Sequence, residues 1–309
     1  MPVTRPLVTA ALAPLGVAGA AVVGAAAWGV GVERYLFTVR YHALRLLPKG
    51  AEPLRVLHVS DAHMAPWQHR KQEWMARLAE LSPDLVINTG DNLGHRDGLT
   101  GIRTALSPLR GVPGLVVHGS NDYQEPAPRN PFRYFIGPSG HLPAHKHLDV
   151  DALDRFFTDD LGWSILDDTA VSVEIKGLRV NALGVNDGHR GWDHPELIPP
   201  VLETLDAADI TLGVMHAPYR RTLDTFTGLG ADVLLAGHTH GGQVRVPFSP
   251  NALVSNCDIP LDQARGLSEW THDGRTVPLN VSAGLGHSIY APVRFGCRPE
   301  ATLLTLLPR

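Results

Sequence analysis

Two histidines one residue apart, His238 and His240, are the residues with the clearest chemical potential in this chain. They follow the apolar run 231–235, which is typical of a buried strand. Alternate side chains of a strand share a face, so both imidazoles can point the same way. Neutral imidazole is the commonest metal ligand in proteins. The pair therefore predicts part of a metal site if other strand ends supply matching ligands, and a surface loop with two histidines if they do not.

Other ligand-type residues also come directly after apolar runs. Helix-like stretches at 71–81 and 99–109 separate the first strand-like runs, and this alternation predicts a mostly parallel sheet covered by helices. Such sheets bind ligands at the carboxyl ends of their strands, so residues that follow successive strands are expected to meet at one edge. The residues in this position are Asp61, His63, Asp91, His216, His238 and His240.

The later part of the chain predicts a second sheet. Residues 170–185, with a turn at Lys176-Gly177, have the pattern of a β-hairpin. Residues 208–214 form another apolar run before His216. We expect the strands that close this second sheet in the last third of the chain, at 243–247, 279–282 and 302–307.

A mixed set of carboxylates and imidazoles favours divalent ions such as Mn, Fe, Zn or Mg. The carboxylate of Asp91 can bridge two ions, and a pair of ions about 3.5–4 Å apart is suited to phosphoryl transfer. The net charge of −4 and the small number of basic residues argue against a nucleic-acid partner. Two metal ions, rather than lysines, are therefore expected to neutralise a bound phosphate.

The order of these residues resembles the calcineurin-like metallophosphoesterase superfamily over residues 54–307. The extended block 237–243 and the tail 284–300 resemble its membrane-associated bacterial branch. The resemblance implies an α/β fold, a four-layer α/β/β/α sandwich, that hydrolyses phosphate mono- or diesters through a dinuclear metal centre. The blocks that carry it are Asp61-x-His63, Gly90-Asp91, Gly119-Ser120-Asn121-Asp122, His216 and Gly237-His238-Thr239-His240.

The resemblance also implies a role for each of these side chains. It assigns the first ion to Asp61, His63 and His240. It assigns the second ion to His216 and His238, with Asp91 bridging the two. A metal-bound hydroxide would attack phosphorus in line, and the residues to which we assign catalytic roles are Asp91, Asn121 and His238.

One block departs from the family pattern, which is usually Gly-Asn-His-Asp or Gly-Asn-His-Glu. An ungapped alignment places Ser120 at the metal-ligand position and Asn121 at the histidine position. Either a slight shift of the alignment brings Asn121 to the metal, which we favour, or Ser120 or a water completes the coordination shell of the metal. In both cases the histidine that assists the leaving group is absent, and His95 or His118 is a possible substitute. We therefore expect a preference for esters with good leaving groups.

The beginning of the chain predicts a membrane anchor. Residues 7–32 contain no charged residue and are long enough to cross a bilayer as a helix. We divide the chain into an anchor and linker (1–50) and a metallophosphoesterase domain (51–309), held at the cell membrane by a single-pass transmembrane helix. A signal peptide cleaved near 25–27 and a buried soluble helix are the alternatives. The side of the membrane stays open, because the basic residues after the span and a signal-type start favour opposite orientations.

An anchored site would mostly meet membrane substrates, so a lipid-linked phosphate ester is a natural candidate. Residues 124–146, rich in proline and glycine, are long for a loop in a compact domain. They predict either a lid or membrane-facing cap beside the site or a solvated excursion. The competing function is a catalytically weak or inactive membrane-anchored metal-binding protein, which the altered Ser120-Asn121 pair favours.

Overall fold

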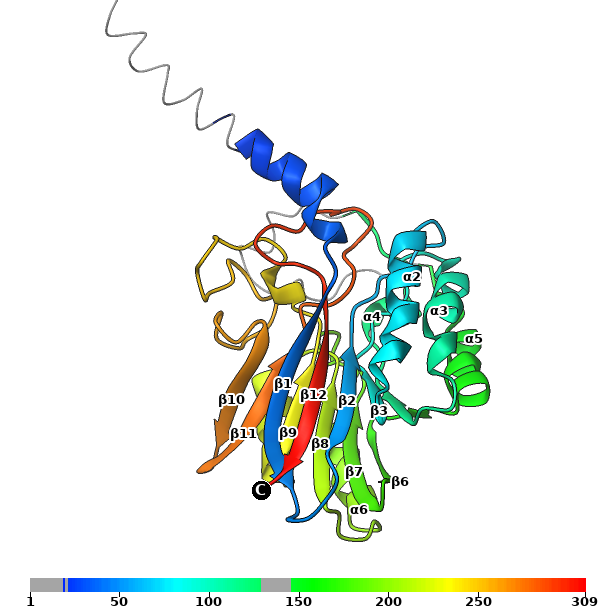
Figure 1. Ribbon diagram of the computed structural model, residues 1–309, viewed down its shortest axis with the longest axis vertical. Helices are drawn as coiled ribbons and strands as arrows, with labels where there is room; N and C mark the ends of the chain where they lie inside the picture. Colours follow the sequence, from blue (N-terminus) through cyan, green and yellow to red (C-terminus); the bar gives the residue numbers. More distant parts are fainter. Residues whose placement is uncertain (1–18, 20–21, 129–145) are drawn as a thin grey trace, which may run out of the picture.

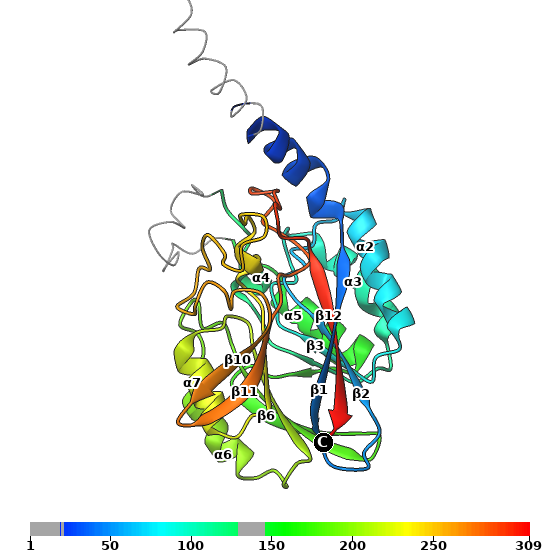
Figure 2. The same ribbon diagram turned by 60° about the vertical axis from the view of Figure 1, so that its left-hand side comes forward.

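Two six-stranded sheets pack face to face, and helices cover the outer face of each (Figures 1 and 2). The computed structural model describes residue 19 and residues 22–128 and 146–309. The layers follow the order helix, sheet, sheet, helix, and both sheets mix parallel and antiparallel strands. The α/β sandwich expected from the sequence is therefore the fold of the described residues.

The first sheet is built around four parallel strands, with two strands from the ends of the chain on one side. Its order is β1-β12-β2-β3-β4-β5, in which β12 is antiparallel to β2 and parallel to β1. The strands are β1 (Thr38–Leu47), β2 (Leu54–Val59), β3 (Leu85–Asn88), β4 (Gly114–Val116), β5 (Ser164–Ile165) and β12 (Glu300–Pro308).

The second sheet also has parallel strands at its centre and an antiparallel strand at each edge. Its order is β10-β11-β9-β8-β7-β6. The predicted hairpin is confirmed as β6 and β7. The strands are β6 (Thr169–Ile175), β7 (Leu178–Val185), β8 (Ile210–Met215), β9 (Val233–Ala236), β10 (Gly266–His272) and β11 (Arg275–Val281).

Each outer layer of helices covers its own sheet. α2, α3 and α5 lie over the first sheet, and α6 and α7 over the second (Figures 1 and 2). The short helix α4 begins directly after the Gly119 turn. The helices are α2 (His69–Ala76), α3 (Gly98–Leu106), α4 (Ser120–Tyr123), α5 (Val150–Arg155), α6 (Ile198–Leu202) and α7 (Arg220–Gly228), and 3-10 turns extend α2 and α3 to Leu81 and Leu109.

Continuous apolar runs form these central strands because both of their faces are buried. In β2, Val56 packs into the core between the sheets, whereas Leu57 packs under the helices. In β3, Ile87 packs into the core between the sheets and Val86 packs under the helices. Each such side chain contributes roughly 1.5–3 kcal/mol by leaving water. This two-sided burial explains why the strands lack polar alternation, as is usual in covered parallel sheets.

The structure places three segments differently from the sequence analysis. Residues 38–47, assigned to the linker, form the edge strand β1. Residues 302–307 form part of β12 in the first sheet rather than closing the second, because their partners are β1 and β2. Residues 243–247 are not a strand; only Val244 forms an isolated bridge, to Phe295.

The predicted transmembrane helix falls partly outside the described residues. Residues 22–31 are helical and project from the same end of the molecule as the loops that follow β8 and β9 (Figure 1). Among the residues that the structure describes, no helix has both the length and the apolar character needed to cross a bilayer. Residues 7–18 and most of the predicted lid, 129–145, lie outside the described residues.

Candidate metal centre

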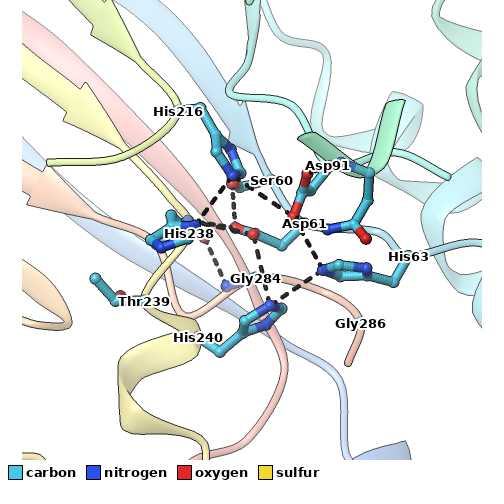
Figure 3. Close-up of polar contacts among 12 residues, drawn as sticks. Ser60, Asp61, His63, Asp91, His216, His238, Thr239, His240, Gly284 and Gly286 are labelled. Carbon is cyan, nitrogen blue, oxygen red and sulfur yellow. Dashed lines mark hydrogen bonds and ion pairs between the residues drawn. The ribbon is translucent and has the colours of Figure 1, made fainter. Parts of the chain in front are cut away.

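The six predicted strand-end residues converge at one end of the sandwich (Figure 3). Asp61 and His63 follow β2, and Asp91 follows β3. His216 follows β8, and the other two histidines follow β9. The carboxyl ends of strands from both sheets therefore meet there, as the sequence predicts. The members of this cluster are Asp61, His63, Asp91, His216, His238 and His240.

The backbone of this cluster is strained. All its members except His216 have a positive φ, between 39° and 65°. Left-handed backbone in residues with a Cβ costs energy and persists only where the surroundings hold it. At the neighbouring Gly119 a side chain would not fit at all, because a Cβ would lie 2.3 Å from Oδ1 of Asp91. The backbone of these turns is thus held in the conformation that brings the side chains of the cluster together.

The first set of donor atoms surrounds His240. Its Nε2 lies 3.1 Å from Nε2 of His63 and 3.7 Å from Oδ1 of Asp61. Donor atoms of these three residues all lie within 4.8 Å of one another. Two imidazole nitrogens that face each other across so short a gap, with a carboxylate beside them, form a suitable cradle for a divalent cation.

The second set lies on the other side of Asp91. Nε2 of His216 is 3.3 Å from Nδ1 of His238. Oδ2 of Asp91 is 3.5 Å from that same His216 nitrogen and 3.4 Å from Nε2 of His63. One oxygen of the Asp91 carboxylate is thus about equally distant from a histidine of each set. Asp61 also lies between the sets, because its donor atoms are within 4.8 Å of those of Asp91 and His216.

The electrostatics of the cluster suit cation binding. Burial lowers the pKa of His63 to about 4 and holds the pKa of His240 well below its usual value, so both rings are neutral donors at pH 7. Burial alone would raise the pKa of Asp91, but the neighbouring His216 outweighs it and holds the pKa well below the usual range. Burial raises the pKa of Asp61 to about 7. A divalent ion would favour the ionised form of Asp61 and release a proton.

The unusual Ser120-Asn121 pair lies beside Asp91. The backbone N–H of Asn121 donates to Oδ1 of Asp91 at 2.8 Å, and its side-chain amide donates to Oδ2 at 2.7 Å. The backbone N–H of Ser120 donates to the buried Asp187. An amide that donates through its nitrogen retains its carbonyl oxygen as a potential metal ligand. Both residues line the same cavity as the histidines.

Asp122 braces this part of the site, a role that the sequence analysis did not assign to it. Its carboxylate accepts hydrogen bonds from the backbone N–H groups of Asp91, Asn92 and Gly119, at 2.9, 2.7 and 3.1 Å. It therefore joins the turn after β3 to the turn after β4. An acidic residue one turn into a short helix is a common cap in sequence, so the pattern alone carried no signal of this bridge.

The two histidines considered as substitutes for the absent family histidine lie elsewhere. His118 is buried between two carboxylates, with Nδ1 2.8 Å from Asp167 and Nε2 2.9 Å from Asp154. His95 lies beside Asp97. Neither lines the cavity at the cluster. His118 therefore belongs to a structural ion-pair network.

A cavity of about 340 Å³ opens from the cluster toward the surface. The polar part of its lining includes most of the converging histidines. His189, whose ring centroid lies 4.3 Å from that of His238, and Arg190 also contribute to it. Loops from three parts of the chain contribute an apolar wall, which consists of Pro126, Ala127, Val244, Leu253, Val254, Tyr290, Ala291 and Val293.

Comparison with known proteins agrees with this geometry. The sequence profile of the family described as calcineurin-like phosphoesterase matches residues 54–242. The uncharacterized metallophosphoesterase YkuE of Bacillus subtilis is 24% identical over 94% of this chain and 95% of its own length. Phosphodiesterase YaeI of Escherichia coli is 25% identical over 88% of each chain. A transmembrane protein with metallophosphoesterase domain from Bos taurus is 25% identical over 84% of this chain and 54% of its own length.

The matched region contains every member of the cluster, and the fold has the two mixed sheets expected of such an enzyme. The donor set is of the mixed carboxylate and imidazole type that holds divalent metals. This protein belongs to the calcineurin-like phosphoesterase family and is a hydrolase that acts on phosphoric esters.

Proposed function

We propose that the protein hydrolyses phosphate mono- or diesters at a dinuclear metal centre. The observation that carries this proposal is the position of Asp91 Oδ2, at 3.4 and 3.5 Å from histidines of two separate donor sets. The two ions would supply Lewis acidity, which activates water and neutralises the charge of the phosphate. Among the described residues that line the cavity, Arg190 is the one arginine or lysine, so the positive charge at the site would come mainly from these ions.

The chain's own residues hold and orient these groups. Asp61, His63 and His240 would bind one ion, and His216 and His238 the other. Asn121 would complete the second set through its carbonyl oxygen, since its nitrogen is already committed to Asp91. Asp122 fixes the turns that carry these ligands, so the donor atoms are in place before a substrate arrives.

The shape of the cavity favours an ester with an apolar group, such as a lipid-linked phosphate. The polar lining at the cluster would receive the phosphate, and the apolar wall would receive a hydrocarbon chain. Tyr290 belongs to the apolar wall and is exposed. Phe248, which is close in the chain to the wall residue Val244, is exposed as well. Burying hydrocarbon against such a wall contributes roughly 0.8 kcal/mol for each CH₂ group.

We further propose that the N-terminal segment holds this opening at the cell membrane by a single-pass anchor. Val22, Val23 and Trp28 are exposed in the helical residues 22–31. This helix projects from the same end of the molecule as the loops that follow β8 and β9 (Figure 1). The named transmembrane relative from Bos taurus lends support to this arrangement.

The proposal is tested with the full chain purified in detergent. We expect Mn²⁺ titration calorimetry to show two bound ions, and the loaded protein to hydrolyse bis-p-nitrophenyl phosphate. Removal of the ions with a chelator should abolish turnover, and their return should restore it. Two bound ions without turnover on any ester would instead support the alternative, a membrane-anchored metal-binding protein.

A pair of leucines tests the apolar wall. Leu253 lines the cavity, whereas Leu261 does not, although they are similarly exposed at 42% and 40%. Leu253→Asp should raise KM for an aryl phosphodiester with a long alkyl chain by about 10-fold or more, because a carboxylate in the wall must lose water when the chain binds. KM for bis-p-nitrophenyl phosphate should change much less. Leu261→Asp should affect neither ester, and equal effects of the two variants would contradict a tail-binding wall.

A further inference from the structure

A row of five buried polar side chains, joined by hydrogen bonds, runs from the core between the two sheets to the metal centre. Its members come from three separate parts of the chain, and each is at most 2% exposed. Only the last of them belongs to the cluster of candidate ligands. We call this row the relay, and its members are, in order, Asn280, His58, Thr89, Ser60 and Asp61.

The relay begins where the two sheets face each other. His58 lies on the same face of β2 as Val56, which packs into the core between the sheets. Asn280 lies in β11 between Leu279 and Val281, which pack under the helices of the second sheet, so its own side chain points the other way. Nδ1 of His58 is 2.8 Å from Nδ2 of Asn280. The relay therefore crosses from one sheet to the other.

Further hydrogen bonds connect His58 to Asp61. Nε2 of His58 lies 2.9 Å from Oγ1 of Thr89, and this hydroxyl donates to Oγ of Ser60 at 2.7 Å. The hydroxyl of Ser60 donates to Oδ2 of Asp61 through a short contact (Figure 3). The other carboxylate oxygen, Oδ1, is the one that lies 3.7 Å from Nε2 of His240. The relay thus contacts one oxygen of Asp61 and leaves the other toward the first donor set.

The two ends of the relay determine the direction of every hydrogen bond in it. An ionised carboxylate only accepts, so Ser60 donates to Asp61 and accepts from Thr89. Oγ1 of Thr89 has then used its own proton and accepts from an N–H at Nε2 of His58. At the other end, the amide nitrogen of Asn280 only donates, which requires an Nδ1 without a proton. Burial lowers the pKa of His58 to about 3, so its ring is neutral and carries a single proton, as this pattern requires.

Thr89 also contacts the second donor set. Its backbone carbonyl oxygen accepts a hydrogen bond from Nδ1 of His216 at 2.7 Å. This contact leaves Nε2 of His216 toward Asp91 and His238. A metal-ligating histidine usually donates its other ring N–H to an acceptor of this kind, which orients the ring. Thr89 is therefore connected to a candidate ligand of each set.

We propose that the relay positions the carboxylate of Asp61 and thereby sets the affinity for the ion that Asp61 binds. Ser60 and Thr89 are its positioning residues, and neither lines the cavity, so they act through Asp61 rather than on a substrate. The donor hydroxyl of Ser60 favours the ionised carboxylate, which is the form that binds a cation. A fully hydrogen-bonded buried network also fixes one geometry, which offsets the cost of burying its polar groups. This inference rests on the proposed metal centre.

The test measures Mn²⁺ binding by calorimetry in the full chain, with far-UV circular dichroism and thermal unfolding as checks of the fold. Ser60→Ala removes the donor to Asp61 and should lower the affinity for at least one ion by about 10–100-fold, the usual effect of losing a hydrogen-bond partner of a ligand. Thr89→Val keeps the shape of the side chain and the carbonyl oxygen that contacts His216, but it lacks the hydroxyl. Its affinity should fall by about 10-fold, the lower end of that range, because Ser60 keeps its own contact. Thr89→Ser retains the hydroxyl and should bind both ions as the parent does.

Thr227→Val is the matched control for Thr89→Val. Thr227 is also fully buried, and its hydroxyl also makes a 2.7 Å hydrogen bond, but to the carbonyl oxygen of Leu223 within α7. The control loses the same hydroxyl and should bind both ions as the parent does. If Ser60→Ala folds and binds both ions with the parent's affinity, the inference is wrong. An effect of Ser60→Ala without any effect of Thr89→Val would also contradict it, because the relay would then end at Ser60.

The protonation of His58 tests the relay in the parent protein, without a substitution that could prevent folding. In protein loaded with diamagnetic Zn²⁺, nitrogen NMR of the histidine rings should show a proton on Nε2 of His58 and none on Nδ1. A proton on Nδ1 instead would break the contact with Thr89 and overturn the inference. A parent protein that binds no ion at all would refute the metal centre and the inference together. A parent that binds two ions and hydrolyses the ester, while Ser60→Ala binds them equally well, would refute the inference alone.

Discussion

Asp91→Asn is expected to lower kcat/KM for bis-p-nitrophenyl phosphate by more than about 10³-fold and to leave the protein folded. The carboxylate of Asp91 faces both donor sets, so its replacement weakens both ions rather than one. A metal centre contributes several kcal/mol of transition-state stabilisation, and each 1.36 kcal/mol corresponds to a factor of ten in rate. Steady-state kinetics at saturating Mn²⁺, together with the metal content of the purified protein, measure the effect.

Asp97→Asn is the matched control for this variant. Asp97 lies in the same connection between β3 and α3, but its side chain is 64% exposed and pairs with His95 and Arg96 rather than with the cluster. It should retain the parent's kinetics and metal content. An Asp91→Asn protein that folds, binds two ions and keeps more than a tenth of the parent's activity would exclude a bridging role for this carboxylate.

His118→Gln should destabilise the protein by about 3 kcal/mol at pH 6, because removal of one partner of a buried ion pair leaves the other charge uncompensated. Burial alone would lower the pKa of His118, but the carboxylates of Asp167 and Asp154 outweigh it and raise the pKa to about 10. Asp154 is about one third exposed, so most of the effect should come from Asp167.

The sign of this pKa shift determines the pH dependence. A histidine whose folded-state pKa is raised stabilises the protein fully below its unfolded value of about 6.5, and this contribution disappears as the pH rises through about 10. The difference between the parent and His118→Gln should therefore be large at pH 6 and small above pH 10. Urea unfolding followed by circular dichroism at both pH values tests this, with His95→Gln as a control expected to stay within about 0.5 kcal/mol of the parent. An equal difference at pH 6 and pH 10 would mean that His118 is neutral.

The sequence predicted the layers and the six strand-end residues because both depend on local patterns. Apolar runs without polar alternation imply strands buried on two faces, and the candidate ligands follow such runs directly. The partner of a strand is not a local property. Residues 302–307 have the apolar character of either sheet, and only the tertiary fold places them between β1 and β2.

The residues that support the site could not be predicted from the sequence for a related reason. Asp122 acts through backbone groups that are far from it in the chain, the N–H groups of Asp91 and Asn92. Any residue type can offer a backbone group, so the sequence does not show which residue makes such a contact. The exchange at Ser120-Asn121 was visible, but the hydrogen bonds from Asn121 to Asp91 needed coordinates.

The strand β1 determines where the chain can be shortened for solution work. It pairs with β12 from Thr38 to Leu47 and thereby covers the side of β12 that faces away from β2. A truncated protein that starts at residue 51 would turn β12 into an open edge, which invites aggregation between molecules. A start ahead of Trp28 would keep both this strand and Glu33, whose carboxylate accepts the N–H of Cys297. Soluble preparations should therefore retain the segment that follows the apolar helix.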